Sequence, residues 1–315
     1  MEKVIEKIMS AQSAAILPHV NEDADALGSC FALAGVMRGM GKKAVVYVSG
    51  AVEGRLSFMG SEYEEYVPGR EYEHDLCVCL DCGDIGRIGE RRELFDAIGN
   101  SVNIDHHYTN TNFADENYVD GSASSTGEIL YRLLKNAGIE ITKETARRLY
   151  TAICSDTGCF KYSSVSPETM RAAAELIETG IDHAEIARLL FDCETLEAAK
   201  LKAEATEKME SFYGGKLRIV TMPEGMCERY GIAAEDAPNL VDIPRTIAGT
   251  EIAVCIKELN GEIRVNLRSN GAADVSLIAA RLGGGGHKKA AGCTVKNASA
   301  DGVKEEIIKE CGYLI

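Results

Sequence analysis

Histidine and aspartate side chains recur in four places along this chain. Two histidines directly follow an aspartate in residues 105–107, and residues 19–25 hold one histidine and two aspartates. Imidazole and carboxylate groups together form a ligand set that suits divalent ions such as Mn²⁺. The pattern therefore favours a two-metal hydrolytic centre. The candidate metal ligands are His19, Asp23, Asp25, Asp81, His106 and Asp156.

Short apolar runs precede three of these motifs and place them at the ends of predicted strands. Helical patterns alternate with the apolar runs, which is typical of an α/β fold with a doubly wound, mostly parallel sheet. Ligands bind such a sheet beyond the carboxyl ends of its strands, so we expect these side chains to meet there. The predicted strands span residues 14–18, 43–48, 76–80 and 101–104, and the predicted helices span residues 26–40, 90–97, 126–136 and 143–154.

The surroundings of each aspartate indicate a different role. Asp81 ends a run too apolar to carry a charge without a partner, which predicts a catalytic carboxylate that bridges two ions. Asp23 and Asp25 repel each other, and cations would relieve that repulsion. The alternative for this pair is two acidic residues at a helix N-terminus. Asp156 precedes an apparent turn, so a simple turn residue is the alternative there, and Asp84 is interpreted as a loop cap.

Four of the six histidines belong to the motifs of interest. Adjacent side chains on an extended segment point apart, so we expect one histidine of residues 106–107 to coordinate metal and the other to face substrate. His74 and His183 lie in polar contexts and are predicted to be surface residues. Residues 125–128 have a capping-box pattern, with a phosphate contact as the alternative.

The second half of the chain has a different pattern. Strand signals return after a helical stretch, and Asn260-Gly261 between two of them predicts a hairpin. We therefore expect a smaller α+β domain, with the active site in the cleft between the two domains. The predicted divisions are residues 1–185 for the catalytic domain, 186–215 for a connecting helix and 216–315 for the substrate-binding domain. The strands predicted in this half span residues 217–222, 251–258, 262–268 and 292–296.

A glycine run in the second half predicts an anion-binding segment. Glycines allow backbone N–H groups to approach an anion closely, and basic residues follow directly. Two arginines four positions apart lie on one face of a strand and could grip phosphate. A flexible turn is the alternative for the glycines. The candidate substrate-binding residues here are Arg264, Arg268, Gly284, Gly285, Gly286, His287 and Lys288.

The overall composition excludes several classes of protein. The net charge of −15 disfavours binding to long duplex nucleic acid, although residues 239–296 carry eight basic against five acidic residues, about +3. No apolar stretch is long enough to span a membrane, and the N-terminus lacks a signal peptide. We expect a cytoplasmic protein whose eleven cysteines are mostly buried free thiols. A homodimer is left open.

The motifs resemble those of the DHH phosphoesterase family, which is named for the sequence found here at residues 105–107. The segment at residues 284–292 is similar to the signature of the DHH-associated C-terminal domain, and the resemblance extends from His19 to about Val295. Size and motif order look most like the nano-RNase and pAp-phosphatase branch. This resemblance implies hydrolysis of short RNA oligonucleotides and linear dinucleotides to nucleoside monophosphates, and of 3′-phosphoadenosine 5′-phosphate (pAp) to AMP. Cyclic dinucleotides are left open as substrates.

The resemblance also implies roles for individual residues. Two divalent ions, Mn²⁺ in our interpretation, would share Asp81. His107 would contact the scissile phosphate, while the second domain would hold the rest of the nucleotide. One ion would be bound by His19, Asp23 and Asp81, and the other by Asp25, Asp81, His106 and Asp156.

This chain departs from the branch at two positions that are not ligands. The branch usually has proline and glycine where this chain has Glu22 and Ala24, so Glu22 would add charge beside the site. Three alternatives to the proposed activity are a manganese inorganic pyrophosphatase, a RecJ-type single-strand exonuclease and a non-catalytic nucleotide sensor. The glycine signature speaks against the pyrophosphatase, and the net charge speaks against the exonuclease. The complete ligand set speaks against the sensor.

Overall fold

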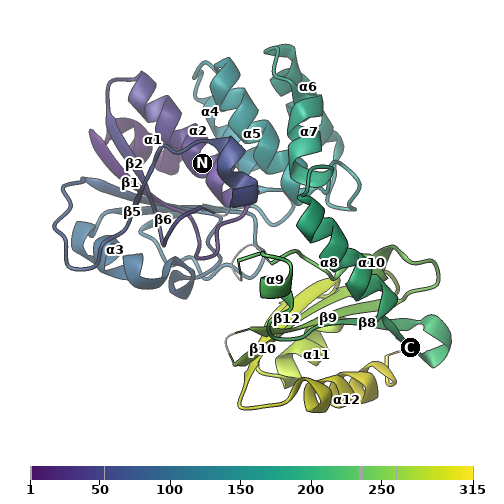
Figure 1. The fold of residues 1–315 in the computed structure, drawn as a ribbon. Coiled ribbons are helices and arrows are strands. Elements are labelled where there is room, and N and C mark those ends of the chain that lie inside the picture. The colour runs from purple at the N-terminus through teal and green to yellow at the C-terminus, as the bar shows by residue number, and fades with distance from the viewer. Residues whose placement is uncertain (1, 53, 234–236, 260, 315) are drawn as a thin grey trace. The chain divides into compact units, whose positions relative to one another are not determined.

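The structure, a computed structural model, describes residues 2–52, 54–233, 237–259 and 261–314. The chain separates into two compact units, Met1–Cys193 and Glu194–Ile315. Each unit is built around its own six-stranded sheet (Figure 1).

The sheet of the first unit is parallel throughout. Its strand order is β3-β2-β1-β4-β5-β6, and every neighbouring pair is parallel. The order reverses direction between β1 and β4, which makes the sheet doubly wound, as predicted. The strands are β1 (Ser13–Leu17), β2 (Lys43–Val48), β3 (Tyr63–Glu65), β4 (Leu76–Leu80), β5 (Ser101–Asp105) and β6 (Glu116–Val119).

The strands missing from the sequence prediction are the two at the edges of this sheet. β3 has only three residues and β6 only four, and neither is fully buried. An edge strand is paired on one side and packs little apolar surface, so it lacks the apolar run by which the four central strands are recognised. The predicted strands therefore correspond to the core of the sheet.

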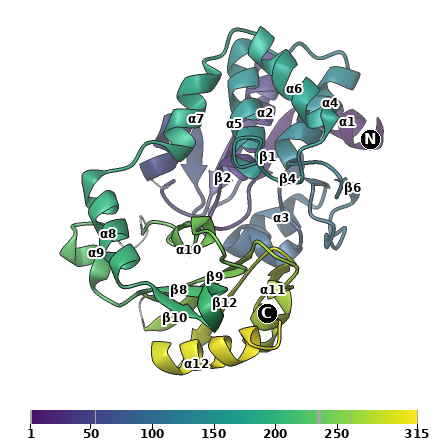
Figure 2. The same cartoon turned by 90° about the vertical axis from the view of Figure 1, so that its right-hand side faces the viewer.

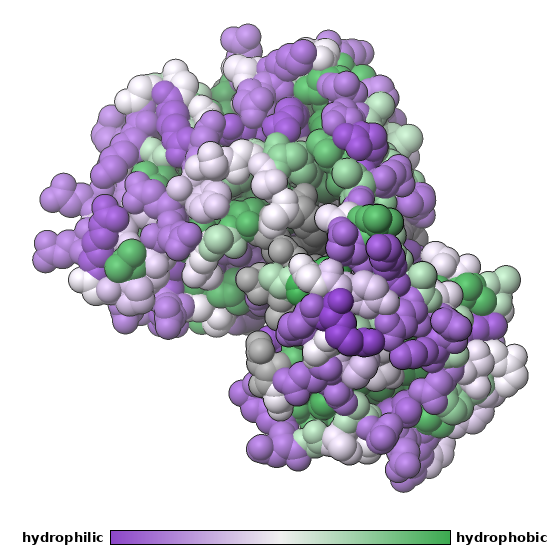
Figure 3. Space-filling model, in the orientation of Figure 1, coloured by the Kyte–Doolittle hydropathy of each residue, from purple (hydrophilic) through white to green (hydrophobic). Residues whose placement is uncertain are grey.

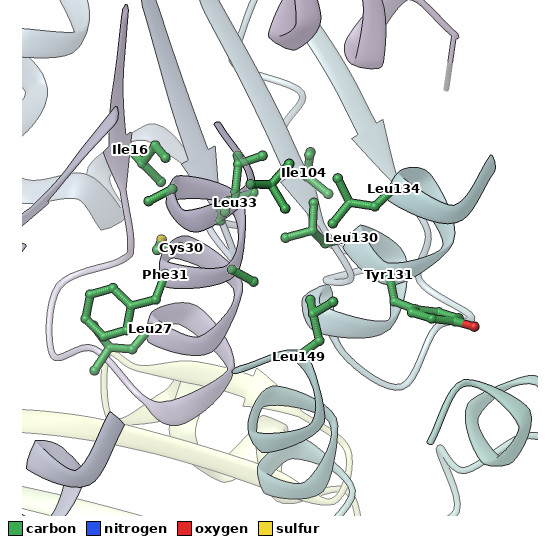
Figure 4. Packing of buried hydrophobic residues seen from close by; sticks show 14 of the residues in the cluster. Ile16, Leu27, Cys30, Phe31, Leu33, Ile104, Leu130, Tyr131, Leu134 and Leu149 are labelled. Carbon is green, nitrogen blue, oxygen red and sulfur yellow. The ribbon is translucent and has the colours of Figure 1, made fainter. Parts of the chain in front are cut away.

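Helices cover both faces of the first sheet. One face packs against α1, α2 and α4–α7, and the other packs against η2 and α3. Figure 4 shows part of the larger core, to which Leu27 and Phe31 of α2, Leu130 of α4 and Leu149 of α5 all belong. The helices are α1 (Glu2–Ser10), α2 (Ala24–Gly39), η1 (Gly54–Met59), η2 (Ile85–Arg91), α3 (Arg92–Ile98), α4 (Thr126–Asn136), α5 (Lys143–Asp156), α6 (Pro167–Glu178) and α7 (His183–Phe191).

Helix α2 packs closely on α5 because it carries a glycine at the contact. A Cβ on Gly28 would lie 2.7 Å from the carbonyl oxygen of Arg148 and 3.0 Å from Cβ of Ala152. Thirteen of the sixteen residues of α2 are buried. The helix that begins within the first histidine–aspartate motif, with Asp25 in its first turn, is thus held rigidly inside the unit.

The second unit has a mixed sheet with the order β11-β12-β10-β9-β8-β7. β8 and β9 are parallel, and the other neighbours are antiparallel. β9 and β10 pair as the hairpin prediction requires, although Asn260 of its turn lies outside the described residues. The strands are β7 (Glu210–Phe212), β8 (Leu217–Met222), β9 (Ile252–Leu259), β10 (Glu262–Ser269), β11 (Gly285–His287) and β12 (Ala290–Lys296).

The two faces of this second sheet are covered by different helices. α11 and α12 pack on one face, while α8, α9 and α10 pack on the other. Figure 2 shows α12 running along the sheet. The helices are α8 (Leu196–Glu207), η3 (Tyr213–Gly215), α9 (Met226–Arg229), α10 (Asp242–Thr246), α11 (Val275–Arg281) and α12 (Ala300–Cys311).

The exposed side chains are largely hydrophilic and most cysteines are buried, as the composition led us to expect. Hydrophilic side chains cover much of the face drawn in Figure 3, and hydrophobic side chains form small groups among them. No helix in the described residues is long and apolar enough to cross a membrane. All eleven cysteines are free, and nine of them are buried, including Cys79 and Cys82 of the C-x-x-C sequence.

The prediction that His74 is a plain surface residue is wrong. Its Nδ1 forms a hydrogen bond of 2.8 Å with the Ser13 hydroxyl, and its Nε2 forms one of 2.9 Å with the Tyr47 hydroxyl. Burial, with a smaller contribution from the charge of Lys43, lowers the pKa of His74 from 6.5 to about 4. The polar residues around His74 in the sequence gave no sign of this pocket, which forms only when β1 and β2 lie side by side.

Replacing His74 by asparagine should make unfolding less dependent on pH. The unfolded chain takes up a proton near pH 6.5, whereas the folded chain resists it until about pH 4, so this contribution is complete above pH 6.5 and is lost as the pH falls towards 4. Half-burial reduces it to about 1–2 kcal/mol. Urea unfolding at pH 7.5 and 4.5 should show wild type losing that much more stability than the variant. Equal losses would contradict the assignment, and His183→Asn, at an exposed histidine, serves as control.

Candidate metal centre

The predicted ligands converge at the carboxyl edge of the first sheet. β1 and β4 are direct neighbours, and β5 lies next to β4, so the segments that follow these three strands are brought together. Asp81 leaves β4 with a φ of +61°, a conformation that is uncommon for residues other than glycine. This left-handed turn places the Asp81 carboxylate, 3% exposed, among the side chains of the neighbouring segments.

A first group of ligand atoms consists of His19, Asp23 and Asp81. Nε2 of His19 lies 3.5 Å from Oδ2 of Asp23 and 3.6 Å from Oδ2 of Asp81. Nδ1 of His19 is 2.8 Å from the carbonyl oxygen of Val20, so it carries a proton and donates it there. Nε2 is thereby the ring nitrogen presented to the two carboxylates, which is the arrangement of a metal-binding histidine.

A second group consists of Asp25, His106 and Asp156. Nε2 of His106 lies 3.3 Å from Oδ2 of Asp156, 3.5 Å from Oδ1 of Asp81 and 3.9 Å from Oδ2 of Asp25. Asp156 is the last residue of α5, so the predicted turn begins after it. Asp81 belongs to both groups, because its Oδ2 faces His19 and its Oδ1 faces His106.

The spacing within both groups fits a shared cation better than direct pairing. All five nitrogen–oxygen separations, 3.3 to 3.9 Å, are longer than an ordinary hydrogen bond. Two ligand atoms that each lie about 2.0–2.2 Å from one ion are separated by roughly 3.0–3.6 Å. The donor set of imidazole nitrogens and carboxylate oxygens suits a divalent ion such as Mn²⁺ or Zn²⁺. The residues therefore fit two adjacent divalent cations.

The electrostatics of the buried carboxylates support the same conclusion. Burial and then the negative charges of Asp81 and Asp156 raise the pKa of Asp25 well above its ordinary value, and burial with the charges of Asp23 and Asp81 does the same for Asp156. Burial alone would lower the pKa of His19, but the interactions with the Asp23 and Asp81 carboxylates, 3.5 and 3.6 Å away, outweigh it and raise the pKa to about 10. The centre thus attracts positive charge, and cations would relieve the repulsion.

The N-terminus of α4 holds two of these carboxylates in place. The backbone N–H groups of Thr126 and Gly127 donate to Asp25 at 2.7 and 2.8 Å, and the Thr126 hydroxyl donates to Oδ1 of Asp81 at 3.0 Å. A helix N-terminus favours negative charge. Sequence reasoning missed Thr126 and Gly127 as positioning residues, because their partners lie 45 to 102 positions away.

The capping-box prediction for residues 125–128 is only half right. The Ser125 hydroxyl accepts a hydrogen bond from the Glu128 N–H at 3.0 Å. The Glu128 carboxylate, however, accepts from the hydroxyls of Ser124 and Thr169 at 2.6 and 2.7 Å. Thr169 comes from α6, so a tertiary contact replaces the local partner of the capping box.

The two neighbouring histidines do not point apart as predicted. Their ring centroids are 4.6 Å apart, and both rings reach Oδ1 of Asp81, His106 at 3.5 Å and His107 at 3.7 Å. The prediction assumed an extended segment, but β5 ends at Asp105. His107 can therefore also be grouped with Asp81 and His106 as a possible ligand set.

Asp105 orients His107, a role that the sequence analysis did not assign to it. Oδ1 of Asp105 lies 2.7 Å from Nδ1 of His107, and Oδ2 accepts a hydrogen bond from the Asn110 side chain at 2.6 Å. Burial would lower the pKa of His107, but the hydrogen bond to Asp105 and nearby negative charge raise it to about 9. The position of Asp105 directly before two histidines was a usable signal, since histidines at functional sites are commonly oriented by carboxylates.

The predicted substrate-binding residues other than His107 lie in the second unit. Arg264 and Arg268 belong to β10, where they occupy the more exposed of its two faces. The glycine run is not a flexible turn, since residues 285–287 form the edge strand β11. A Cβ on Gly284 would lie 2.2 Å from the carbonyl oxygen of Gly292, and one on Gly286 would lie 2.5 Å from Cα of Ala291. These glycines therefore allow β11 to lie against β12.

Comparisons with known proteins match each of the two units to a separate domain family. The profile described as "DHH family, N-terminal domain" matches residues 13–153, and the "DHHA1 domain" profile matches residues 214–313. The bifunctional oligoribonuclease and PAP phosphatase NrnA of Thermus thermophilus is 32% identical over 297 residues, which cover 93% of this chain and 87% of that protein. The chain belongs to the DHH family of phosphoesterases. The NrnA of Bacillus subtilis is 29% identical over 88% of this chain and 87% of its own length.

The fold of this DHH chain is also found in a crystal structure. An exopolyphosphatase-related protein from Bacteroides fragilis superposes with a TM-score of 0.91 at 25% identity, covering 99% of this chain and 96% of that one. The family resemblance, the α/β fold class and the assignment as a hydrolase of phosphoester bonds are thereby confirmed.

Asp84 is a cap, as predicted, because its side chain accepts a hydrogen bond from the Gly86 N–H at 2.8 Å.

Proposed function

We propose that this chain hydrolyses short RNA oligonucleotides and linear dinucleotides to nucleoside monophosphates, and pAp to AMP, with two divalent ions of which Mn²⁺ is the preferred one. The observation that carries the proposal is the position of Asp81, whose two oxygens face the two separate ligand groups. The relatives named as both oligoribonuclease and PAP phosphatase support the substrate class.

We assign the two ligand groups to the two ions. One ion is held by His19, Asp23 and Asp81, and the other by Asp25, Asp81, His106 and Asp156. When bound, such a pair of ions activates water and offsets the negative charge on phosphoryl oxygens. The backbone N–H groups at the start of α4 keep the Asp25 carboxylate aimed at the second group.

His107 is proposed to act on the scissile phosphate. Its Nδ1 is engaged by Oδ1 of Asp105 at 2.7 Å, which orients the ring beside Oδ1 of Asp81, 3.7 Å away. The hydrogen bond to Asp105 and the nearby negative charge outweigh burial and raise the pKa of His107 to about 9. A protonated imidazole can donate a hydrogen bond to a phosphoryl oxygen and can protonate the leaving oxygen.

The second unit is proposed to hold the rest of the nucleotide. Arg264 and Arg268 project from the exposed face of β10 and can bind phosphate with two parallel hydrogen bonds each. Exposed basic residues follow the edge strand β11. The residues assigned to substrate binding in this unit are Arg264, Arg268, Gly284, Gly285, Gly286, His287 and Lys288.

A substrate panel tests this function directly. Purified protein with Mn²⁺ should convert pApA and pGpG to mononucleotides and pAp to AMP and phosphate, while pyrophosphate stays intact. Cyclic di-AMP belongs in the panel to decide whether the cyclic form is opened, and Mg²⁺ in place of Mn²⁺ tests the metal preference. Protein stripped of metal with EDTA should be inactive. Consumption of pyrophosphate alone would overturn the assignment in favour of a pyrophosphatase.

A further inference from the structure

The loop that carries His19 and Asp23 is attached to the short helix η2. The Val20 N–H donates to the carbonyl oxygen of Arg87 at 2.7 Å. Gly89 has a φ of +58°, and a Cβ there would lie 2.7 Å from a methyl group of Val20. The loop therefore packs tightly on η2, an element that follows Asp81 along the chain.

A buried arginine continues this attachment. The Arg91 side chain is only 1% exposed, and it donates to the carbonyl oxygens of Tyr47 and Ile88 at 2.7 and 3.1 Å. Its Nη1 lies 3.4 Å from Oε1 of Glu22, which also accepts the Ser49 N–H at 3.0 Å. Nη2 is buried with no hydrogen-bond partner in the described part of the chain. The Glu22 carboxylate thus compensates the buried positive charge of Arg91. Without that carboxylate, the charge would remain buried and uncompensated, which is strongly destabilising.

In the sequence, Glu22 stands between His19 and Asp23, two of the three proposed ligands of the first ion. On its C-terminal side, Asp23 is fixed by capping α2, because its Oδ1 accepts the N–H groups of Asp25 and Ala26 at 3.1 and 3.0 Å. On its N-terminal side, Asn21 has a φ of +57°, so the loop bends sharply there. The contact of Glu22 with Arg91 holds the middle of a loop whose two ends carry ligands.

We propose that Glu22 and Arg91 form a positioning pair that presets this loop for the first divalent ion. The inference deepens the proposed function and rests on it. Neither side chain touches substrate or ion; the pair acts through His19 and Asp23. Arg91 offsets the negative charge that Glu22 adds beside the site. The role of Glu22 is therefore to hold the loop in place.

Metal titration of the apoprotein tests the pair independently of catalysis. Glu22→Gln retains an oxygen for the Ser49 N–H but removes the charge. Isothermal titration with Mn²⁺ should show the Kd of one ion raised about 10-fold or more, the size expected when groups that orient ligands are lost, while the Kd of the other ion changes little. Activity should recover at saturating Mn²⁺. The matched control is Glu90→Gln, which removes an exposed charge directly beside Arg91 and should leave both constants unchanged.

The possible outcomes separate the two proposals. If Glu22→Gln melts at a lower temperature but binds both ions as wild type does, the pair is merely structural and the inference fails. If wild type itself binds no divalent ion, the proposed function fails. If Glu22→Gln proves too unstable to titrate, Glu22→Asp replaces it, because the shorter side chain keeps the charge but withdraws it from Arg91. This variant is expected to bind the first ion more weakly, and unchanged binding would again overturn the inference.

Discussion

Replacing Asp81 by alanine is expected to lower the hydrolysis of pApA by about 10³-fold or more. The two oxygens of this carboxylate face the two ligand groups separately, so its loss removes a ligand from both proposed ions at once. The variant should also bind fewer Mn²⁺ ions than wild type. Steady-state kinetics together with metal titration would measure both effects.

The matched control is Asp84→Ala. Asp84 is an aspartate three positions further on, but its side chain caps η2 and is not in either ligand group. Its loss should cost about 1 kcal/mol of stability and leave turnover within a few-fold of wild type. An Asp81→Ala protein that binds two ions and retains most of its activity would contradict the bridging role.

Replacing His107 by alanine is expected to lower kcat by about 10²–10³-fold while both ions remain bound. Asp105 holds one ring nitrogen at 2.7 Å, which orients the ring beside the Asp81 carboxylate. The variant therefore loses an oriented imidazole that can donate a hydrogen bond to the phosphate. The kinetics of pAp and pApA hydrolysis at saturating Mn²⁺ would measure the loss.

His183→Ala is the control for this experiment, since His183 is exposed at the start of α7. It should behave as wild type. The structure also groups His107 with Asp81 and His106, which gives the experiment a second informative result. Weakened Mn²⁺ binding in His107→Ala, with kcat restored by excess metal, would move His107 from the substrate to the ligand set.

The fold and the candidate ligands were largely predictable from local sequence. Apolar runs mark the four central strands, and the polar motif that follows three of them can lie only at the carboxyl edge of a parallel sheet. The edge strands β3 and β6 escaped prediction because they are short and half exposed. Residues such as Asp81 were found because a carboxylate at the end of a fully apolar strand needs a partner.

The partners of those residues were not predictable, because each comes from a distant segment. Thr126 reaches Asp81 across 45 positions, and Arg91 reaches Glu22 across 69. The pocket of His74 and the displaced partner of Glu128 arise in the same way. Nothing in the local spacing of these residues records such contacts, since a hydrogen bond between segments depends on how the strands are ordered.

The sequence by itself determined which chemical groups are present and that they stand at strand ends, because hydrophobic periodicity and residue type are local properties of the chain. Only the tertiary structure decided that β1, β4 and β5 are neighbours, that the two oxygens of Asp81 face different groups, and that His106 and His107 lie on the same side. The reason is physical: a metal centre requires several charged groups within a few ångströms of one another, and only a packed core can hold them there against their mutual repulsion.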